Sequence, residues 1–309
     1  MKNKNHESLN LANLEQFLET KSNLALSILM SNEPDLIPSW HHGMVLDQRR
    51  YDFYKLEIDS AAKDKIVLDL GSGSGLLTQL ALDAGAKHVY AVEIHPVLST
   101  CFAHSFRKEI EEGKVTLLAK SSEKLTKEDF IKGAPQVLVH ELFGSNPLAE
   151  NVLNIFDDLF QRDIISPSLA FIPQSFKILG VLNKTELSSG IPNERMNKFW
   201  YLEDLCYFGR TFNPNKKLEK VSKDFHLFTY DLEDLSKIVR NEFVVQANNE
   251  GNCVRVWFEI QGKASVLTTD IDQNESNHWG NIHYYLKFKQ GEVYIECEHY
   301  QGNLTFQTT

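Results

Sequence analysis

The chain has 309 residues with a formal net charge of -10, and 42% of its residues are hydrophobic. This length and composition predict a globular protein of two modest lobes, and the acidic balance argues against nucleic-acid binding, because phosphate contacts need a basic stripe. We expect no membrane span, since no apolar run is long enough, and no secretory signal, since the first residues lead into an amphipathic pattern and not into an apolar run. Four scattered cysteines without a CxxC pair predict no metal site and a reducing, cytoplasmic location.

The amino-terminal part of the chain reads as helical. Apolar residues recur at near-helical spacing between residues 8 and 31, which predicts one or two amphipathic helices within an amino-terminal cap of residues 1–39. Pro34 and Pro38 interrupt this pattern. Residues 40–62 then return to a helical pattern that leads into the next element.

Residues 65–93 read as strand, glycine turn, helix and second strand. The apolar run of residues 66–70 predicts a parallel strand buried on both faces. The glycines that follow allow a sharp turn and a close approach to a ligand, and the first amides of a helix over residues 76–84 would point at an anionic group. The second strand, residues 88–93, ends on the carboxylate of Glu93.

Two classes of cofactor are considered for this glycine loop. The dehydrogenase fingerprint requires a glycine or alanine where this chain has Leu76. A GxGxG loop between two acids, Asp69 and Glu93, resembles instead the class I methyltransferases that use S-adenosylmethionine, in which Glu93 would bind the ribose hydroxyls. A tight turn in some other α/β protein is the remaining alternative.

Alternating elements continue beyond the loop. A helix over residues 96–112, a strand over residues 115–118, a turn with Ser122 and Glu123, and a strand over residues 136–139 predict a doubly wound parallel sheet. Ligands of such sheets bind beyond the carboxyl ends of the strands. The residues that fall at this edge are Gly71, Glu93, Glu123 and Glu141.

After about residue 175 the pattern changes to short strands with turn signals between them, which predicts an antiparallel β-barrel lobe. The expected domains are therefore residues 40–174 and 175–309. An aromatic-rich insertion at residues 185–222 is either a dimerisation arm or a local cover of the barrel. The expected strands are residues 176–184, 225–231, 242–248, 253–261, 281–288, 292–299 and 303–308.

The segment HELFGSNPLAEN carries two acids around a turn. Glu141 and Glu150 would converge on one cation, and a guanidinium suits them because its planar fork of donors matches carboxylates. At this point the chain resembles the protein arginine methyltransferases, and its ELF wording is most similar to the monomethylating seventh member of that family. The match runs in order from about residue 41 to the last residue and includes MVLDQRRYDFY, Ser121–Glu123 and NHWGN.

The resemblance implies a role for each matching residue. Met44 would lie against S-adenosylmethionine, Arg50 would bind its carboxylate, and the turn at Ser122 and Glu123 would bind adenine. Asp47 would pair with His278, and Trp279 would wall the substrate channel. The implied cofactor residues are Met44, Arg50, Asp69, Gly71, Ser72, Gly73, Gly75, Glu93, Ser122 and Glu123, the implied catalytic residues are Glu141, Glu150, His278 and Asp47, and the implied substrate residues are Trp279 and Phe143.

The chain departs from the family pattern at His140, Phe143 and Asn277, where other members have Ser or Thr, Met, and Thr. Phe143 would restrict space beside the transferred methyl, which favours monomethylation. The acceptor is the arginine of a protein, a peptide or the free amino acid, and the resemblance implies a homodimer. A scaffold without catalysis and a methyltransferase for another cationic small molecule are the alternative functions.

Overall fold

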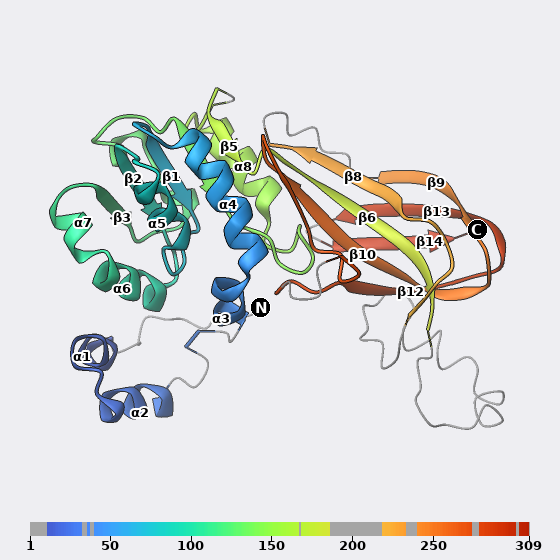
Figure 1. Ribbon diagram of the computed structural model, residues 1–309, viewed down its shortest axis with the longest axis horizontal. Helices are drawn as coiled ribbons and strands as arrows, with labels where there is room; N and C mark the ends of the chain where they lie inside the picture. Colours follow the sequence, from blue (N-terminus) through green and yellow to red (C-terminus); the bar gives the residue numbers. More distant parts are fainter. Residues whose placement is uncertain are drawn as a thin grey trace. The chain divides into compact units, whose positions relative to one another are not determined.

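The computed structural model describes residues 11–32, 36–37, 40–166, 168–185, 218–232, 240–273, 278–300 and 303–308. The chain forms two compact units (Figure 1). The Rossmann-like unit comprises Met1–Glu141 and Asp158–Ile172, and the barrel unit comprises Leu142–Asp157 and Pro173–Thr309. The domain limits expected from the sequence stay predictions. Most of the expected dimerisation arm, residues 186–217, and Asn277 lie outside the described residues.

The Rossmann-like unit contains a five-stranded parallel sheet in the order β3-β2-β1-β4-β5. Its central strands are fully buried and consist almost only of apolar residues, because both faces of such a sheet are covered. The predicted doubly wound sheet is confirmed. Its strands are β1 (Ile66–Leu70), β2 (His88–Val92), β3 (Val115–Leu118), β4 (Val137–His140) and β5 (Ala170–Ile172).

Two helices predicted as single elements are each divided in the structure. Residues 40–62 form α3 (Trp40–Leu46) and α4 (Gln48–Ala61), because Asp47 has an extended backbone and its carboxylate accepts a hydrogen bond from the Arg50 amide at 3.0 Å. This is the geometry of a helix N-cap, which a periodicity pattern does not detect. Residues 96–112 likewise form α6 (Pro96–Ser105) and α7 (Arg107–Glu111), separated by Phe106.

The remaining helices are α1 (Ala12–Thr20), α2 (Asn23–Asn32), α5 (Leu76–Asp83) and α8 (Val152–Gln161). The first two confirm the helices predicted within residues 8–31, as far as the described residues reach. Leu14 of α1 and Leu29 of α2 pack with Val97 of α6 in one apolar cluster. The α8 helix was not predicted, because it begins two residues after Glu150 and no turn signal separates it from the segment that carries the two glutamates.

The barrel unit consists of antiparallel sheets, as predicted (Figure 1). The long strands β6 and β10 pair along nine residues, and β8 and β12 extend that sheet, while β9, β13 and β14 form a second one. The strands β5, β7 and β11 were not predicted, since two or three residues show no period. The strands of this unit are β6 (Ser175–Lys184), β7 (Glu219–Lys220), β8 (Phe225–Asp231), β9 (Arg240–Ala247), β10 (Gly251–Gln261), β11 (Val266–Thr268), β12 (Ile282–Phe288), β13 (Gly291–Tyr300) and β14 (Asn303–Thr308).

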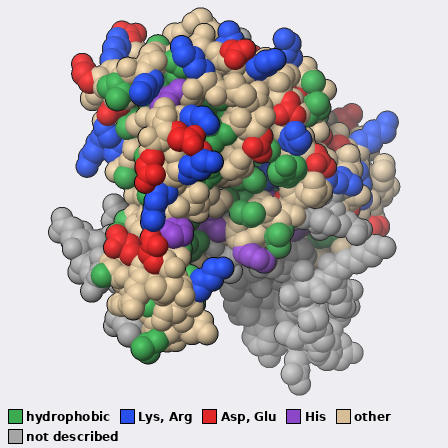
Figure 2. Space-filling view, turned by 60° about the vertical axis from the view of Figure 1, so that its left-hand side comes forward, with side chains coloured by type: hydrophobic (Ala, Val, Ile, Leu, Met, Phe, Trp, Pro, Cys, Tyr) green, Lys and Arg blue, Asp and Glu red, His purple; other side chains and the backbone are tan. Residues whose placement is uncertain are grey.

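The surface of the Rossmann-like unit mixes charges of both signs. Figure 2 brings this unit forward and shows lysine, arginine and acidic side chains interspersed over its face. Some of them form ion pairs along one helix, such as Lys55 with Asp59 at 2.6 Å. Among the described residues, no helix is both long and apolar enough to cross a membrane.

Gly75 is the position at which the loop tolerates a side chain least. Its φ is 91°, and an alanine Cβ there would lie 2.2 Å from Cε2 of Phe106. We expect Gly75→Ala to lower the free energy of unfolding by about 3 kcal/mol, through overpacking and backbone strain. Urea unfolding measures this loss.

Gly73→Ala is the matched control. Gly73 also has a positive φ, of 54°, but a Cβ there would meet no neighbouring atom closer than 4.0 Å. Its expected loss is about 1 kcal/mol, the cost of the left-handed backbone alone. Equal losses in the two variants would contradict this account.

Candidate active site

The glycine loop is fixed to the end of β2. The amides of Gly71 and Ser72 both donate to the carbonyl of Val92, at 3.0 and 2.9 Å. Gly71, Gly73 and Gly75 all have positive φ values, which glycine adopts without steric cost. The tight turn predicted from the sequence therefore brings the loop to the carboxyl edge of the parallel sheet.

Glu93 closes the loop from the other side. Its Oε2 accepts a hydrogen bond from the Gly73 amide at 2.8 Å, and its Oε1 accepts one from the His95 amide at 2.6 Å. The hydroxyl of Ser99 donates to its backbone carbonyl at 3.1 Å. Glu93 is only 6% exposed, and it lies beside the glycine loop. Its predicted role in binding ribose stays a prediction.

Asp69 lies beneath the loop at the end of β1. It is fully buried, and its Oδ2 accepts a hydrogen bond from Thr78 Oγ1 at 2.7 Å. Burial, the largest cause, raises the pKa of this carboxyl from 3.8 to about 7. Thr78, which positions Asp69, was not singled out in the sequence, because a threonine inside a helix gives no distinct signal.

Arg50 in the first turn of α4 is bound to Glu141. Its Nη2 donates to Glu141 Oε2 at 3.0 Å and its Nη1 donates to the carbonyl of Met44 at 3.3 Å, while Arg50 itself is 2% exposed. Its guanidinium also lies 5.4 Å from the centre of the Tyr54 ring. Met44, Arg50 and Glu141 are thus brought together within one unit.

Tyr54 fixes the residue that precedes Glu141. Its hydroxyl donates to the backbone carbonyl of His140 at 2.9 Å, and both side chains are buried. Burial lowers the pKa of His140 to about 3, so its imidazole is neutral near pH 7. Burial and the nearby Glu141 raise the pKa of Tyr54, which keeps its hydroxyl a donor. His140 therefore fills a core position, and Tyr54 orients the end of β4.

The predicted adenine turn is a short 3-10 helix, Ser122–Lys124. Ser122 is half-buried and Glu123 is exposed. Arg162, which follows α8, donates to the carbonyls of Leu125 at 2.6 Å and Ser122 at 2.9 Å. Arg162 therefore holds the turn in place. Sequence reasoning missed it, because it lies 40 residues from the turn.

In the barrel unit, the loop of Trp279 is bound to the segment of Phe143. The indole Nε1 donates to the Phe143 carbonyl at 2.8 Å, and the hydroxyl of Ser145 donates to the Trp279 carbonyl. The Phe143 ring packs against Phe176 and Phe258, with centroids 5.2 and 5.5 Å apart. Two segments far apart in sequence thus form one structure, which we call the Trp279–Phe143 junction.

The other two predicted catalytic residues of the barrel unit lie beside this junction. The His278 ring is 3.9 Å from the Trp279 ring, centre to centre. Glu150 is exposed, and a Cβ placed on Gly144 would be 3.7 Å from its Oε1. Glu141 and Asp47 belong to the Rossmann-like unit. The pairing of Glu141 with Glu150, and of Asp47 with His278, therefore stays a prediction.

Comparisons with known proteins agree with this arrangement, although no family model matches the chain. The chain is 23% identical over 255 residues to an arginine N(omega)-methyltransferase of Streptomyces achromogenes subsp. streptozoticus, covering 79% of this chain and 70% of the relative. It is 25% identical over 300 residues to protein arginine N-methyltransferase 1 of Schizosaccharomyces pombe, covering 85% of this chain and 83% of the relative. It also resembles a chain of the PRMT1 enzyme-prozyme complex of Trypanosoma brucei, with a TM-score of 0.68 at 19% identity over 84% of this chain and 87% of that one.

A parallel sheet with a glycine loop, combined with an antiparallel barrel, is the fold shared with that solved structure. In sequence, the chain is similar to arginine N-methyltransferases over 79% and 85% of its length. The resemblance to arginine methyltransferases that the motifs predicted is confirmed.

The buried Asp69 predicts a pH-dependent stability. Between about pH 4 and 7 the folded protein keeps a proton on Asp69 that the unfolded chain releases, so this residue makes stability fall as pH rises. Asp69→Asn lacks this effect. We expect the stability of the variant, relative to the natural chain, to increase by about 1.4 kcal/mol per pH unit across this window and to level off above it.

Urea unfolding of both proteins between pH 4 and 8 measures the difference. Asp83→Asn is the control, since this carboxylate lies at the end of α5 and pairs with the exposed Gln79. A constant difference between Asp69→Asn and the natural chain would show that Asp69 is ionised throughout.

Proposed function

We propose that this chain transfers a methyl group from S-adenosylmethionine to a guanidino nitrogen of arginine. The observation that carries the proposal is the bond between Glu141 and the guanidinium of Arg50, at 3.0 Å. A carboxylate at the carboxyl end of β4 is thus already oriented to hold a planar cation. This edge of a parallel sheet is also where ligands bind.

The residues of the glycine loop fit the cofactor. Within the described part of the chain, three buried polar atoms near the loop have no hydrogen-bond partner: Ser72 Oγ, Asp69 Oδ1 and Arg50 Nε. Buried polar atoms are normally paired, so these suit a polar ligand. Gly73 leaves space in which a Cβ would meet nothing closer than 4.0 Å. The related Trypanosoma brucei complex was solved with AdoHcy.

Each residue then has a definite task. Glu93, whose two oxygens accept hydrogen bonds from the Gly73 and His95 amides, would also bind the ribose hydroxyls. Arg50 would bind the carboxylate of the methionine end. The turn at Ser122 and Glu123 would bind adenine. When bound, S-adenosylmethionine supplies an electrophilic methyl group on its sulfonium.

Glu141 and Glu150 would act on the acceptor. A guanidinium remains protonated at any working pH, so its nitrogens are weak nucleophiles. Two carboxylates on its far side localise the positive charge there and leave electron density on the nitrogen that attacks. Positioning and electrostatic stabilisation of this kind supply several kcal/mol of the barrier reduction. His278, paired with Asp47, would receive the proton released during transfer.

We also propose the acceptor, the product and the oligomeric state. The acceptor is an arginine in a protein, in a peptide or as the free amino acid. The product is monomethylarginine, because Phe143 occupies a position at which many relatives have methionine. The chain assembles as a homodimer through residues 185–222.

Glu141→Gln tests the function. The amide keeps the size of the side chain but loses the negative charge that binds the guanidinium, so we expect methyl transfer to fall at least about 100-fold. Mass spectrometry of free L-arginine and of a glycine- and arginine-rich peptide measures the transfer, and calorimetry with S-adenosylmethionine measures cofactor binding, which should persist.

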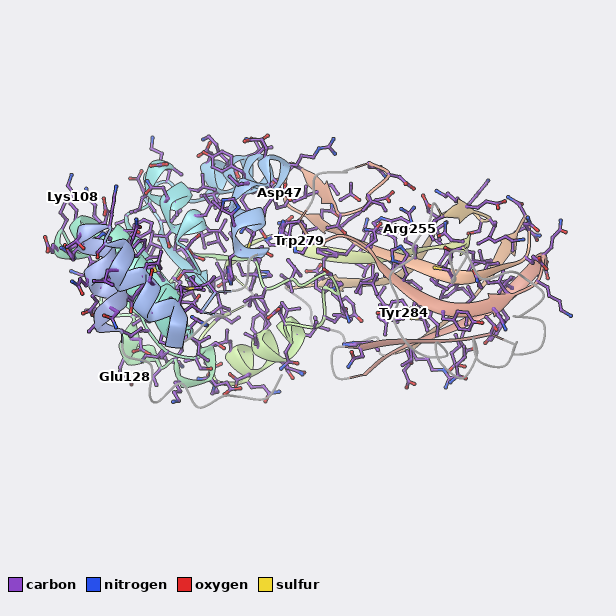
Figure 3. The ribbon with its side chains drawn as sticks, turned by 90° about the horizontal axis from the view of Figure 1, so that it is seen from below. Asp47, Lys108, Glu128, Arg255, Trp279 and Tyr284 are labelled. Atoms are coloured by element: carbon purple, nitrogen blue, oxygen red, sulfur yellow. The ribbon has the colours of Figure 1, made fainter. Side chains whose placement is uncertain are left out.

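Glu128→Gln is the control, since Glu128 is an exposed carboxylate of the same unit (Figure 3). Undiminished turnover in Glu141→Gln would sink the proposal. Cofactor binding without methylation of either acceptor by the natural chain would shift it to another cationic acceptor, and no binding at millimolar cofactor would favour a scaffold.

Phe143→Met tests the product. Phe143 is buried among aromatic rings, and methionine of similar size should be tolerated there. If the ring restricts the space beside the methyl, the variant should form dimethylarginine in addition to monomethylarginine. Mass spectrometry of the products decides this, and dimethylarginine from the natural chain would contradict monomethylation.

A further inference from the structure

A single buried guanidinium joins both ends of the loop that carries His278 and Trp279. Arg255 lies in the middle of β10, in the barrel unit (Figure 3). Its Nη2 donates to Asp272 Oδ2 at 2.6 Å and its Nη1 donates to Asp270 Oδ1 at 3.1 Å, both before the loop. Nη1 also donates to Asn281 Oδ1 at 3.3 Å, after the loop. The two ends are therefore held at one point.

Burial makes these bonds strong constraints. Arg255 and Asp270 are each 2% exposed, whereas the side chain of Asp272 is 60% exposed. A buried cation is costly unless it is paired and hydrogen-bonded, so the loop ends must supply these oxygens.

Asn281 completes the closure. Its Nδ2 donates to the carbonyls of Thr269 at 2.7 Å and Gly280 at 3.0 Å, and its Oδ1 accepts from the Ile271 amide at 3.3 Å. Asp270 in turn accepts hydrogen bonds from the Asp272 amide and from the Gln273 side chain, both at 3.2 Å. Residues 269–273 and 280–281 thus form one hydrogen-bonded base, which we call the loop base.

The loop base is linked to the segment of the predicted glutamates. Trp279 lies two residues before Asn281, and it forms the Trp279–Phe143 junction with Phe143 and Ser145. That segment, Leu142–Asp157, also contains Glu150. A displacement of the loop base would therefore displace Trp279 and, through the junction, the backbone that leads to Glu150.

We propose that Arg255 is a positioning residue for the reaction. It closes the loop base and thereby sets the position of His278, Trp279 and the Phe143 segment, without touching substrate. Its kinetic consequence rests on the proposed function, whereas the closure itself does not. Two further residues face Arg255. The Trp257 ring of β10 lies 5.3 Å from the guanidinium, and His283 of β12 is the cross-strand partner of Arg255.

Arg255→Met combined with Asp270→Asn separates positioning from stability. The two changes remove the ion pair without leaving a buried charge unpaired, so the fold should be retained. We expect kcat for arginine methylation to fall about 100-fold, as for a misplacement of about 1 Å, with unchanged affinity for S-adenosylmethionine. Arg255→Lys keeps the charge but not the fork of donors, so its kcat should lie between those of the natural chain and the double variant.

Hydrogen exchange gives a readout that needs no activity. In the double variant, amide exchange should accelerate at residues 269–273, 278–281 and 142–148, while β6 and β13 keep their protection. Arg240→Met, which removes an exposed ion pair on β9, is the control and should change neither measurement.

The outcomes are distinct. Wild-type exchange at residues 142–148 in the double variant, or exchange accelerated equally across the barrel strands, would overturn the proposal, as would an unchanged kcat. If the natural chain methylates no arginine acceptor, the proposed function fails, and the exchange experiment still decides whether Arg255 sets the loop base.

Discussion

The buried pair of Arg50 and Glu141 is the interaction on which the Rossmann-like unit most depends. Each charge would be costly alone in this interior, so α4 and the end of β4 must stay together. The Asp47 carboxylate caps α4 by accepting a hydrogen bond from the Arg50 amide, and the Tyr54 hydroxyl donates to the His140 carbonyl, just before Glu141. The ion pair thus also sets the direction of the carboxylate that the proposed reaction uses.

The glycine loop is held by backbone hydrogen bonds and by buried polar groups. Backbone amides fix Glu93, and burial keeps Asp69 protonated well above the usual pH for a carboxyl. Positive φ values at three glycines make this close approach possible.

The barrel unit places its polar contacts where segments distant in sequence meet. Trp279 binds the Phe143 backbone, and Arg255 joins both ends of the loop that carries Trp279. Aromatic packing of Phe143 with Phe176 and Phe258 supplies the apolar support. Hydrogen bonds fix the geometry of this region, and burial of the rings stabilises it.

The fold class, most strands, the glycine loop with Glu93 and the resemblance to arginine methyltransferases could be predicted from the sequence, because these depend on local periodicity and on residues close together in the chain. The sequence did not determine the break at Asp47, the short strands, or the roles of Thr78, Arg162 and Arg255. Only the tertiary structure decided these, because capping geometry and buried partners between 9 and 40 residues away leave no periodic signal. The difference has a physical origin: hydrophobic patterning is written along the chain, whereas the pairing of buried polar groups is defined only once the chain has folded.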